Sequence, residues 1–171
     1  ARERGVETEV AYFNPETAAR LRERYGRARL ITATNSFPHI PCLAGYLDGV
    51  AALLEPDGMF VVEAHYLGDL VEQNAFDTIY HEHVSYWALG PLERLVRRHG
   101  LEVFDVERLP IHHGQLRAWI GLAGRHAVEP AVARLRAEEE RAGLTRLDTF
   151  IALAKRVAAL RQGNKGVEAS E

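Results

Sequence analysis

Two short apolar segments, residues 28–34 and 59–64, constrain the fold of this chain most, because each has the length and composition of a buried strand. Between them, from Pro41 to Leu54, apolar residues repeat at helical spacing, and Glu-Pro-Asp-Gly at 55–58 predicts a turn that ends this helix. A strand, a helix and a second strand in this order predict an α/β layer with a largely parallel sheet.

Other segments continue the same alternation on both sides. Asn14 and Pro15 are typical of the first turn of a helix, and Gly26 is suited to its end. The hydrophobic periodicity predicts three further strands and one further helix: strands at 6–10, 101–107 and 115–122, and a helix at 90–100. The predicted sheet therefore extends beyond its first two strands.

The composition is that of one globular domain with a sizeable core. Of 171 residues, 47% are hydrophobic and 26% are charged, and no apolar run approaches the roughly 18 residues of a membrane span. The net charge of -3 provides no general attraction to nucleic acid. Cys42 is the only cysteine, which excludes an internal disulfide and a cysteine-rich zinc site in these residues. We expect a cytoplasmic protein without membrane or nucleic-acid partners, and the oligomeric state is left open.

Residues 76–87 carry an unusual density of side chains that handle protons. Among them are the imidazoles of His81 and His83, the carboxylate of Glu82 and the phenols of Tyr80 and Tyr86. Such a set can supply a general base, a group that orients it, and a donor to a developing oxyanion. The segment therefore predicts a proton-abstraction site.

Polar residues also follow the two central strands. In open α/β sheets, ligands bind beyond the carboxyl ends of the strands. Segments 35–39 and 63–66 occupy this position, and residues 80–83 follow after a short connection. We expect the three segments to converge on one cleft.

The chain from residue 129 onward has a different character. Residues 129–160 are rich in Ala, Arg, Glu and Leu and are interrupted at Gly143, which predicts two helices. The second predicted helix has an apolar stripe that needs a partner, formed by Leu147, Phe150, Ile151, Ala154 and Ala158. Residues 162–166 predict a turn, and 167–169 predict the start of another strand.

Four motifs occur in order within residues 35–117. They are residues 35–39, residues 54–63 with 66–69, residues 77–83, and residues 109–112 with Gly114, Leu116 and Arg117. Together they resemble the S-adenosylmethionine-dependent C-methyltransferases that act on nucleotide-linked keto-sugars. The resemblance implies an enzyme with an α/β fold, namely the second half of a class I (Rossmann-like) methyltransferase sheet followed by connecting helices.

The resemblance also implies a reaction. A nucleotide-linked 4-keto-6-deoxy sugar loses the proton beside its ketone, and the enolate takes a methyl group from S-adenosylmethionine. Tyr80, Glu82 and His83 match catalytic positions of the family, with His39 as a further site residue. Either Tyr80 or His83 takes the proton while Glu82 orients a neighbour, and the sequence leaves this choice open. If the segment is extended, Tyr80 and Glu82 share one face, and His83 lies on the other.

Further positions are implied as ligand contacts. Asn35, Tyr66, His112 and Arg117 correspond to substrate-binding positions, and Asn35 with Ser36 to cofactor-binding positions. Arg117 alternates with apolar residues on a predicted strand, so a solvent-facing or ion-paired arginine is an alternative to one that binds a phosphate.

The chain departs from the family pattern in four respects. His113-Gly114-Gln115 stands where the family has two glycines and a serine, and Ser36-Phe37-Pro38 replaces small apolar residues. No glycine-rich cofactor turn precedes Val6, and the family's amino-terminal cysteine-rich zinc module is absent from these residues. We therefore interpret the chain as an interior fragment that by itself binds S-adenosylmethionine weakly or not at all and is inactive. The predicted divisions are a partial methyltransferase domain at 1–125, connecting helices at 126–162, and the start of a further α/β domain at 163–171.

Two other functions are open at this stage. One is a metal-dependent hydrolase or oxygenase that uses a His/Glu cluster, drawn from His65, His81, Glu82, His83, His112 and His113. The spacing of these residues fits no standard metal motif, and no metal site is predicted. The other is a non-catalytic helical module whose apolar stripe near Phe150 binds a partner.

Overall fold

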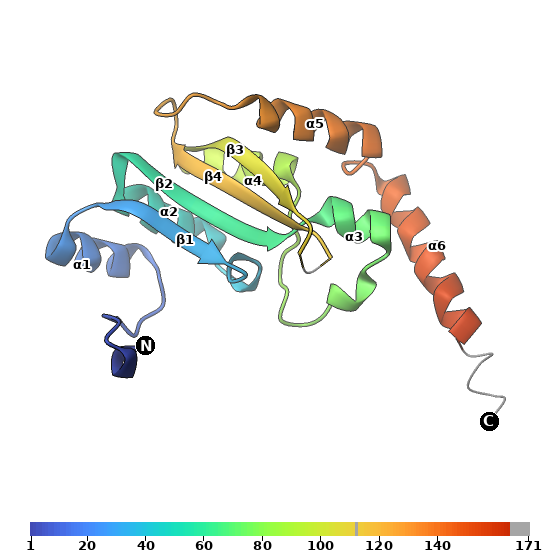
Figure 1. The fold of residues 1–171 in the computed structure, drawn as a ribbon, viewed down its shortest axis with the longest axis horizontal. Coiled ribbons are helices and arrows are strands. Elements are labelled where there is room, and N and C mark those ends of the chain that lie inside the picture. Colours follow the sequence, from blue (N-terminus) through green and yellow to red (C-terminus); the bar gives the residue numbers. More distant parts are fainter. Residues whose placement is uncertain (112, 165–171) are drawn as a thin grey trace.

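The computed structural model describes residues 1–111 and 113–164. It contains one sheet, and along the chain helices precede, connect and follow its strands (Figure 1). The strands are β1 (Ala28–Thr34), β2 (Leu54–His65), β3 (Leu101–Leu109) and β4 (Gln115–Leu122). The α-helices are α1 (Pro15–Tyr25), α2 (Leu43–Leu53), α3 (Leu67–Gln73), α4 (Leu89–Arg97), α5 (Pro130–Ala142) and α6 (Leu147–Asn164). Three short 3₁₀ helices are η1 (Arg2–Arg4), η2 (Phe37–His39) and η3 (Phe76–Thr78). No helix in the described part of the chain is long and apolar enough to cross a membrane.

The sheet is mixed, with the strand order β1-β2-β4-β3. Only β1 and β2 pair in parallel, whereas β4 pairs antiparallel with both β2 and β3. The prediction of an α/β fold is confirmed, but the prediction of a largely parallel sheet is wrong. The reason is that β3 and β4 are joined by a short connection, so β4 must reverse direction and then enters the sheet between β2 and β3.

One edge of the sheet collects the polar ends of the strands. Thr34 at the end of β1 pairs with Glu63, His65 at the end of β2 pairs with Gln115, and Gln115 in turn pairs with Leu109 at the end of β3. The carboxyl ends of β1, β2 and β3 therefore lie together, and we refer to this side as the carboxyl edge.

Local signals explain several element boundaries. Asn14 accepts a hydrogen bond from the backbone N–H of Thr17 at 2.8 Å and caps α1, with Pro15 in its first turn. The predicted turn at 55–58 is instead part of β2, where the pairing with β1 shifts register. The predicted strand at 6–10 is wrong, because these residues have no strand partner and follow η1 as an irregular, mostly exposed segment.

The two faces of the sheet differ. Helices α2 and α4 cover one face (Figure 1), where Phe60 and Ile120 are fully buried. Residues that alternate with these point to the other face, where Leu30 is 55% exposed and Met59 is 36% exposed. The hydrophobic core therefore lies between one sheet face and its helices.

Helix α5 packs against β3 and α4, and α6 extends away from the sheet (Figure 1). The break predicted at Gly143 is confirmed, since this residue ends α5 with a φ of 68°. Of the predicted apolar stripe of α6, only Phe150 packs on the core, whereas Leu147 is 73% exposed and Ile151 is 42% exposed. Leu153 and Val157 also pack on the core, so the face that α6 turns to this chain is rotated from the stripe.

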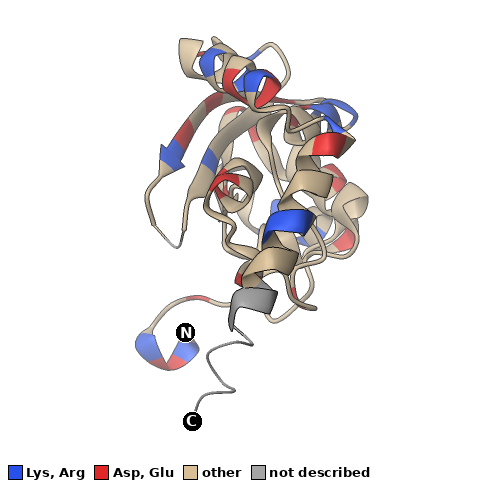
Figure 2. Ribbon diagram, turned by 90° about the vertical axis from the view of Figure 1, so that its right-hand side faces the viewer, with Lys and Arg blue, Asp and Glu red and all other residues tan. Residues whose placement is uncertain are grey.

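Up to residue 160, α6 carries only three charged side chains, Asp148, Lys155 and Arg156, and is largely tan in Figure 2. It continues to Asn164, past the start of the turn predicted at 162–166. The strand predicted at 167–169 lies outside the described residues, and so does most of the division predicted at 163–171.

Candidate active site

His83 is the centre of a cluster of aromatic and imidazole rings at the carboxyl edge. It is only 9% exposed. Its ring centroid lies 4.4 Å from that of Tyr80, 4.9 Å from His39, 5.1 Å from His65 and 6.0 Å from Tyr86. The rings come from η2, from the end of β2 and from the 76–87 segment. The three segments expected to converge are therefore brought together.

Hydrogen bonds fix the tautomer of His83. Its Nδ1 lies 2.8 Å from the carbonyl oxygen of Thr78, and a carbonyl only accepts, so Nδ1 carries the hydrogen. In the neutral ring, Nε2 then presents a lone pair. The hydroxyl of Tyr80 lies 3.3 Å from Nε2 and can donate to it. This arrangement gives His83 an available basic nitrogen with a hydroxyl beside it.

The 80–83 segment is a turn, in which the N–H of His83 donates to the carbonyl of Tyr80 at 3.1 Å. Tyr80 and His83 therefore meet, whereas an extended segment would have placed them on opposite faces. The carbonyl oxygen of Glu82 accepts a hydrogen bond from Nδ1 of His39 at 2.7 Å. In this structure Glu82 thus orients His39 through its backbone, while its side chain is exposed.

Asn35 and Ser36 follow β1 directly and are exposed at the carboxyl edge. Asn35 has a φ of 52°, and its N–H donates to the carbonyl of Glu63 at 2.8 Å. Its side-chain Oδ1 accepts a hydrogen bond from Nε2 of Gln115, also at 2.8 Å. Asparagine tolerates this left-handed conformation better than most residues, so the predicted ligand contact sits on a tightly held turn.

Arg117 lies on β4 with carboxylates on both neighbouring strands. Its guanidinium donates to Glu63 at 2.8 and 3.0 Å, and to Glu107 at 3.3 Å. Glu63 is 8% exposed, so the pair neutralises a buried carboxylate. Arg117 therefore takes the ion-paired arrangement that the sequence left as an alternative.

Tyr66 is 3% exposed, and its hydroxyl donates to Oε1 of Glu139 at 3.2 Å. Burial, and then the negative charge of Glu139, raise the pKa of Tyr66 well above its usual range. The tyrosine is thus committed to a buried contact with α5. His112, the remaining predicted substrate residue, lies outside the described residues.

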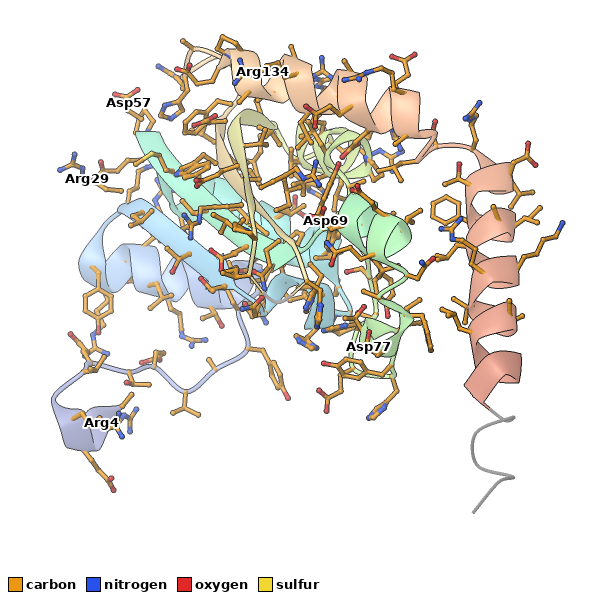
Figure 3. The ribbon with its side chains drawn as sticks, turned by 45° about the vertical axis from the view of Figure 1, so that its right-hand side comes forward. Arg4, Arg29, Asp57, Asp69, Asp77 and Arg134 are labelled. Atoms are coloured by element: carbon orange, nitrogen blue, oxygen red, sulfur yellow. The ribbon has the colours of Figure 1, made fainter. Side chains whose placement is uncertain are left out.

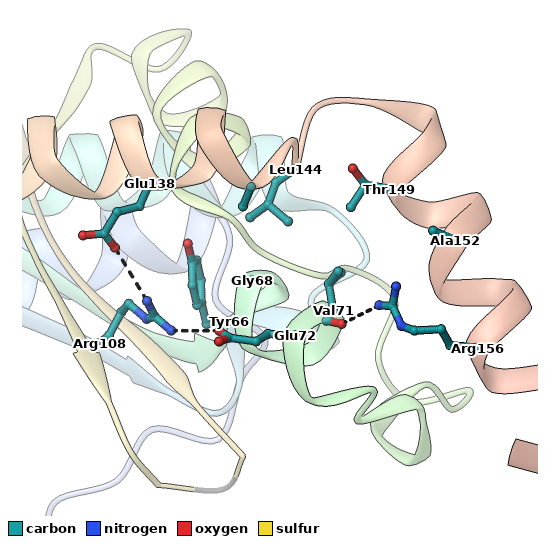
Figure 4. A pocket seen from close by; sticks show the side chains of 11 residues that line it. Tyr66, Gly68, Val71, Glu72, Arg108, Glu138, Leu144, Thr149, Ala152 and Arg156 are labelled. Carbon is teal, nitrogen blue, oxygen red and sulfur yellow. Dashed lines mark hydrogen bonds and ion pairs between the residues drawn. The ribbon is translucent and has the colours of Figure 1, made fainter.

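A cavity of about 550 Å³ separates α3 from α5 and α6 (Figure 4). In it, Arg108 lies over the ring of Tyr66 at 5.1 Å and pairs with Glu138 at 3.6 Å. Arg108 also pairs with Asp69, which extends from α3 toward the β3–β4 hairpin (Figure 3). Arg156 donates to the carbonyl of Val71 at 2.8 Å. Both arginines are thus engaged by protein acceptors.

A second hollow, of about 460 Å³, opens beside His39 and Ser36. Its wall is mostly apolar and includes Phe13 and Tyr46. Since the hollow borders the ring cluster, it offers space for an apolar ligand group next to the candidate catalytic residues.

Within residues 1–111 and 113–164, no group of three or more His, Cys, Asp or Glu side chains is arranged to hold a metal ion. Nδ1 of His39 and Nδ1 of His83 are both engaged by backbone carbonyls. The described residues therefore give the metal-dependent alternative no support.

Sequence reasoning missed two residues of this region, Gln115 and Glu139. Both are buried polar side chains whose partners lie far away in the sequence, Asn35 for Gln115 and Tyr66 for Glu139. For Gln115, the one available sequence signal was that glutamine stands where the family pattern has a serine. No sequence signal marked Glu139 among the acidic residues of its helix.

The fold is a four-stranded α/β sheet with polar groups gathered at its carboxyl edge. The family model described as "Methyltransferase domain" matches residues 3–106 of it. A second model, "C-methyltransferase C-terminal domain", matches residues 110–167. The chain belongs to the S-adenosylmethionine-dependent C-methyltransferase family, which confirms the resemblance seen in its motifs.

Among curated proteins, the C-methyltransferase NovU of Streptomyces niveus is 46% identical over 145 residues. The match covers 84% of this chain and 34% of NovU, so the chain spans about a third of the length of this relative. Neither the metal-dependent alternative nor the helical interaction module is supported by these matches.

Solved structures give weaker similarity. A methyltransferase in complex with the Haloferax volcanii Trm112 activator has a TM-score of 0.48 and 13% identity, over 74% of this chain and 67% of that chain. An S-adenosylmethionine-dependent methyltransferase of Anabaena variabilis has a TM-score of 0.46 and 16% identity, over 64% and 55%.

Proposed function

We propose that this chain forms the substrate side of a methyl-transfer site that acts on a carbon acid. The substrate is a nucleotide-linked 4-keto-6-deoxy sugar, methylated on the carbon beside its ketone. The observation that carries the proposal is the Tyr80–His83 pair, in which the lone pair of Nε2 on a buried imidazole faces the Tyr80 hydroxyl. The C-methyltransferase name of the relative NovU supports carbon as the methyl acceptor.

In the proposed reaction, His83 is the general base. Its Nε2 takes the proton from the carbon beside the ketone, and the electron pair of the broken C–H bond moves onto the ketone oxygen. The Tyr80 hydroxyl then donates its hydrogen bond to this enolate oxygen instead of to Nε2. This hydrogen bond stabilises the developing negative charge. The carbonyl of Thr78 holds Nδ1–H and stabilises the imidazolium that forms.

His39 and His65 form the wall around this pair. Their rings lie within about 5 Å of His83, and Nδ1 of His39 is held by the carbonyl of Glu82. These contacts limit rotation of His39 and thereby restrict how a substrate can approach Nε2 of His83. His39 is therefore a positioning residue in this proposal.

S-adenosylmethionine, when bound, supplies the methyl group that the enolate carbon takes. Asn35 and Ser36 are exposed polar groups at the carboxyl edge beside the cluster, a donor set that suits the polar end of this cofactor. They would hold that end in place. The ion pairing of Arg117 with Glu63 and Glu107 argues for a structural role of this arginine over phosphate binding.

The experiment uses the full-length protein and a nucleotide-linked 4-keto-6-deoxy sugar in deuterated water. We expect deuterium to enter the carbon beside the ketone without S-adenosylmethionine, and a methyl group to enter when the cofactor is added. An enzyme that methylates an oxygen or nitrogen atom, or that exchanges no proton at carbon, would refute the proposal.

A further inference from the structure

Gln115 is a fully buried amide at the carboxyl edge. It begins β4, has an exposed fraction of 0%, and pairs across the sheet with His65, whose ring contacts His83. A long amide side chain at this position distinguishes the chain from the family pattern, which has a serine here. Its location makes it a neighbour of the ring cluster without being part of it.

The side chain of Gln115 makes one described hydrogen bond, from its Nε2 to Oδ1 of Asn35 at 2.8 Å. The two ends of a carboxamide point in different directions, so engaging Oδ1 turns the NH₂ group of Asn35 away from Gln115. Because the backbone N–H of Asn35 is also held, by Glu63, the whole residue is fixed. Asn35 is thereby presented as a hydrogen-bond donor on an exposed turn.

The other end of Gln115 has no such partner. Its Oε1 is buried, and no donor among the described residues lies within hydrogen-bonding distance. A buried acceptor without a partner is unfavourable, and an apolar side chain of similar size would avoid it. The bond to Asn35 is therefore the contact that distinguishes glutamine from an apolar residue at this position.

We propose that Gln115 is a positioning residue that holds Asn35 with its NH₂ group toward the ligand, where it donates to a carbonyl or carboxylate oxygen. This inference rests on the proposed function, because it assumes that ligands bind at the carboxyl edge. The oxygen can belong to the substrate ketone or to the carboxylate of the cofactor. Both sources share the same chemistry, and binding measurements separate them.

The test is a double-mutant cycle in the full-length protein, with Gln115→Met, Asn35→Ala and the double variant. Methionine keeps the length of glutamine and removes both amide groups. The readouts are the Kd of S-adenosylhomocysteine by calorimetry and the KM and kcat for the sugar nucleotide. Gln73→Met, the same substitution at an exposed position of α3, is the matched control.

We expect Gln115→Met to weaken the interaction with one of the two ligands about tenfold, because one oriented hydrogen bond is lost. Gln73→Met should leave both interactions unchanged. A weaker Kd identifies the cofactor carboxylate, and an unchanged Kd with a lower kcat for the sugar nucleotide identifies the substrate ketone oxygen, where negative charge develops. In the Asn35→Ala background, Gln115→Met should have no further effect. If Gln115→Met does not fold, Gln115→Ser replaces it in the same cycle.

Equal effects of Gln115→Met in both backgrounds, or no effect in either, would overturn the inference. If the wild-type protein does not transfer a methyl group to carbon, the proposed function is refuted and this inference is not. The two can be separated because calorimetry measures the coupling between Gln115 and Asn35 through ligand binding, which needs no turnover. A wild-type protein that binds neither ligand overturns both.

Discussion

The hydroxyl of Tyr80 lies 3.3 Å from Nε2 of His83, and the two ring centroids are 4.4 Å apart. Because Nδ1 of His83 is held by the Thr78 carbonyl, this hydroxyl meets the only nitrogen of the ring that can accept a proton. The pair thus divides two tasks, proton removal and oxyanion stabilisation, between adjacent groups.

Replacing His83 with asparagine should remove the general base and lower kcat by about 10²- to 10⁴-fold, the usual contribution of such a group. The asparagine keeps a polar group of similar size, so the fold should persist. Deuterium uptake at the sugar carbon and methyl transfer should fall together when measured in the same preparation. His99→Asn is the control, because His99 pairs with Asp48 away from the cluster, and it should keep wild-type rates.

Replacing Tyr80 with phenylalanine should lower kcat by about 10²- to 10³-fold, as expected for loss of one donor to an oxyanion. Nε2 of His83 remains available, so deuterium exchange at carbon should slow but stay above that of His83→Asn. Exchange that vanishes in Tyr80→Phe and survives in His83→Asn would identify the tyrosine as the base. Tyr25→Phe, at an exposed position of α1, should leave both rates unchanged.

Much of the fold could be predicted from local sequence. The strand at 28–34 has the predicted bounds, and Asn14 caps its helix as its position indicated. The antiparallel insertion of β4 could not be read locally, because a strand pattern carries no direction. The meeting of Tyr80 with His83 depends on a turn that the sequence did not reveal.

The candidate site shows the same division. Side chains that handle protons could be predicted from composition alone, since residues 76–87 hold so many of them. Their orientation could not, because it depends on carbonyl groups such as Thr78 O and Glu82 O. The contact between Gln115 and Asn35 joins residues 80 positions apart, and its existence depends on the sheet register.

Replacing Glu139 with alanine should destabilise the fold by about 2–4 kcal/mol, because it leaves several buried donors without an acceptor. Glu139 is 4% exposed and accepts from the backbone N–H of Leu89 at 2.5 Å and of Gly90 at 3.0 Å. It thereby caps α4 from the neighbouring helix α5 and also binds the Tyr66 hydroxyl. Urea unfolding provides the measurement.

The control for this change is Glu140→Ala, since the adjacent Glu140 is exposed. It should change the free energy of unfolding by less than about 0.5 kcal/mol, as is usual at the surface. Equal destabilisation by the two variants would show that the loss of a glutamate anywhere on this turn of α5, and not the loss of the cap on α4, is responsible.

The pKa of Tyr66 predicts how stability depends on alkaline pH. Burial and the charge of Glu139 raise this pKa in the folded state, while the unfolded chain titrates near the ordinary value of about 10. The stabilisation is therefore complete below about pH 10 and is lost as pH rises toward the folded pKa, with a slope of at most about 1.4 kcal/mol per pH unit. Tyr66→Phe has no proton to lose, so its unfolding free energy should fall less steeply above pH 10 than that of the wild type. Tyr12→Phe, at a position 93% exposed, should keep the wild-type slope, and parallel curves for Tyr66→Phe and the wild type would contradict the prediction.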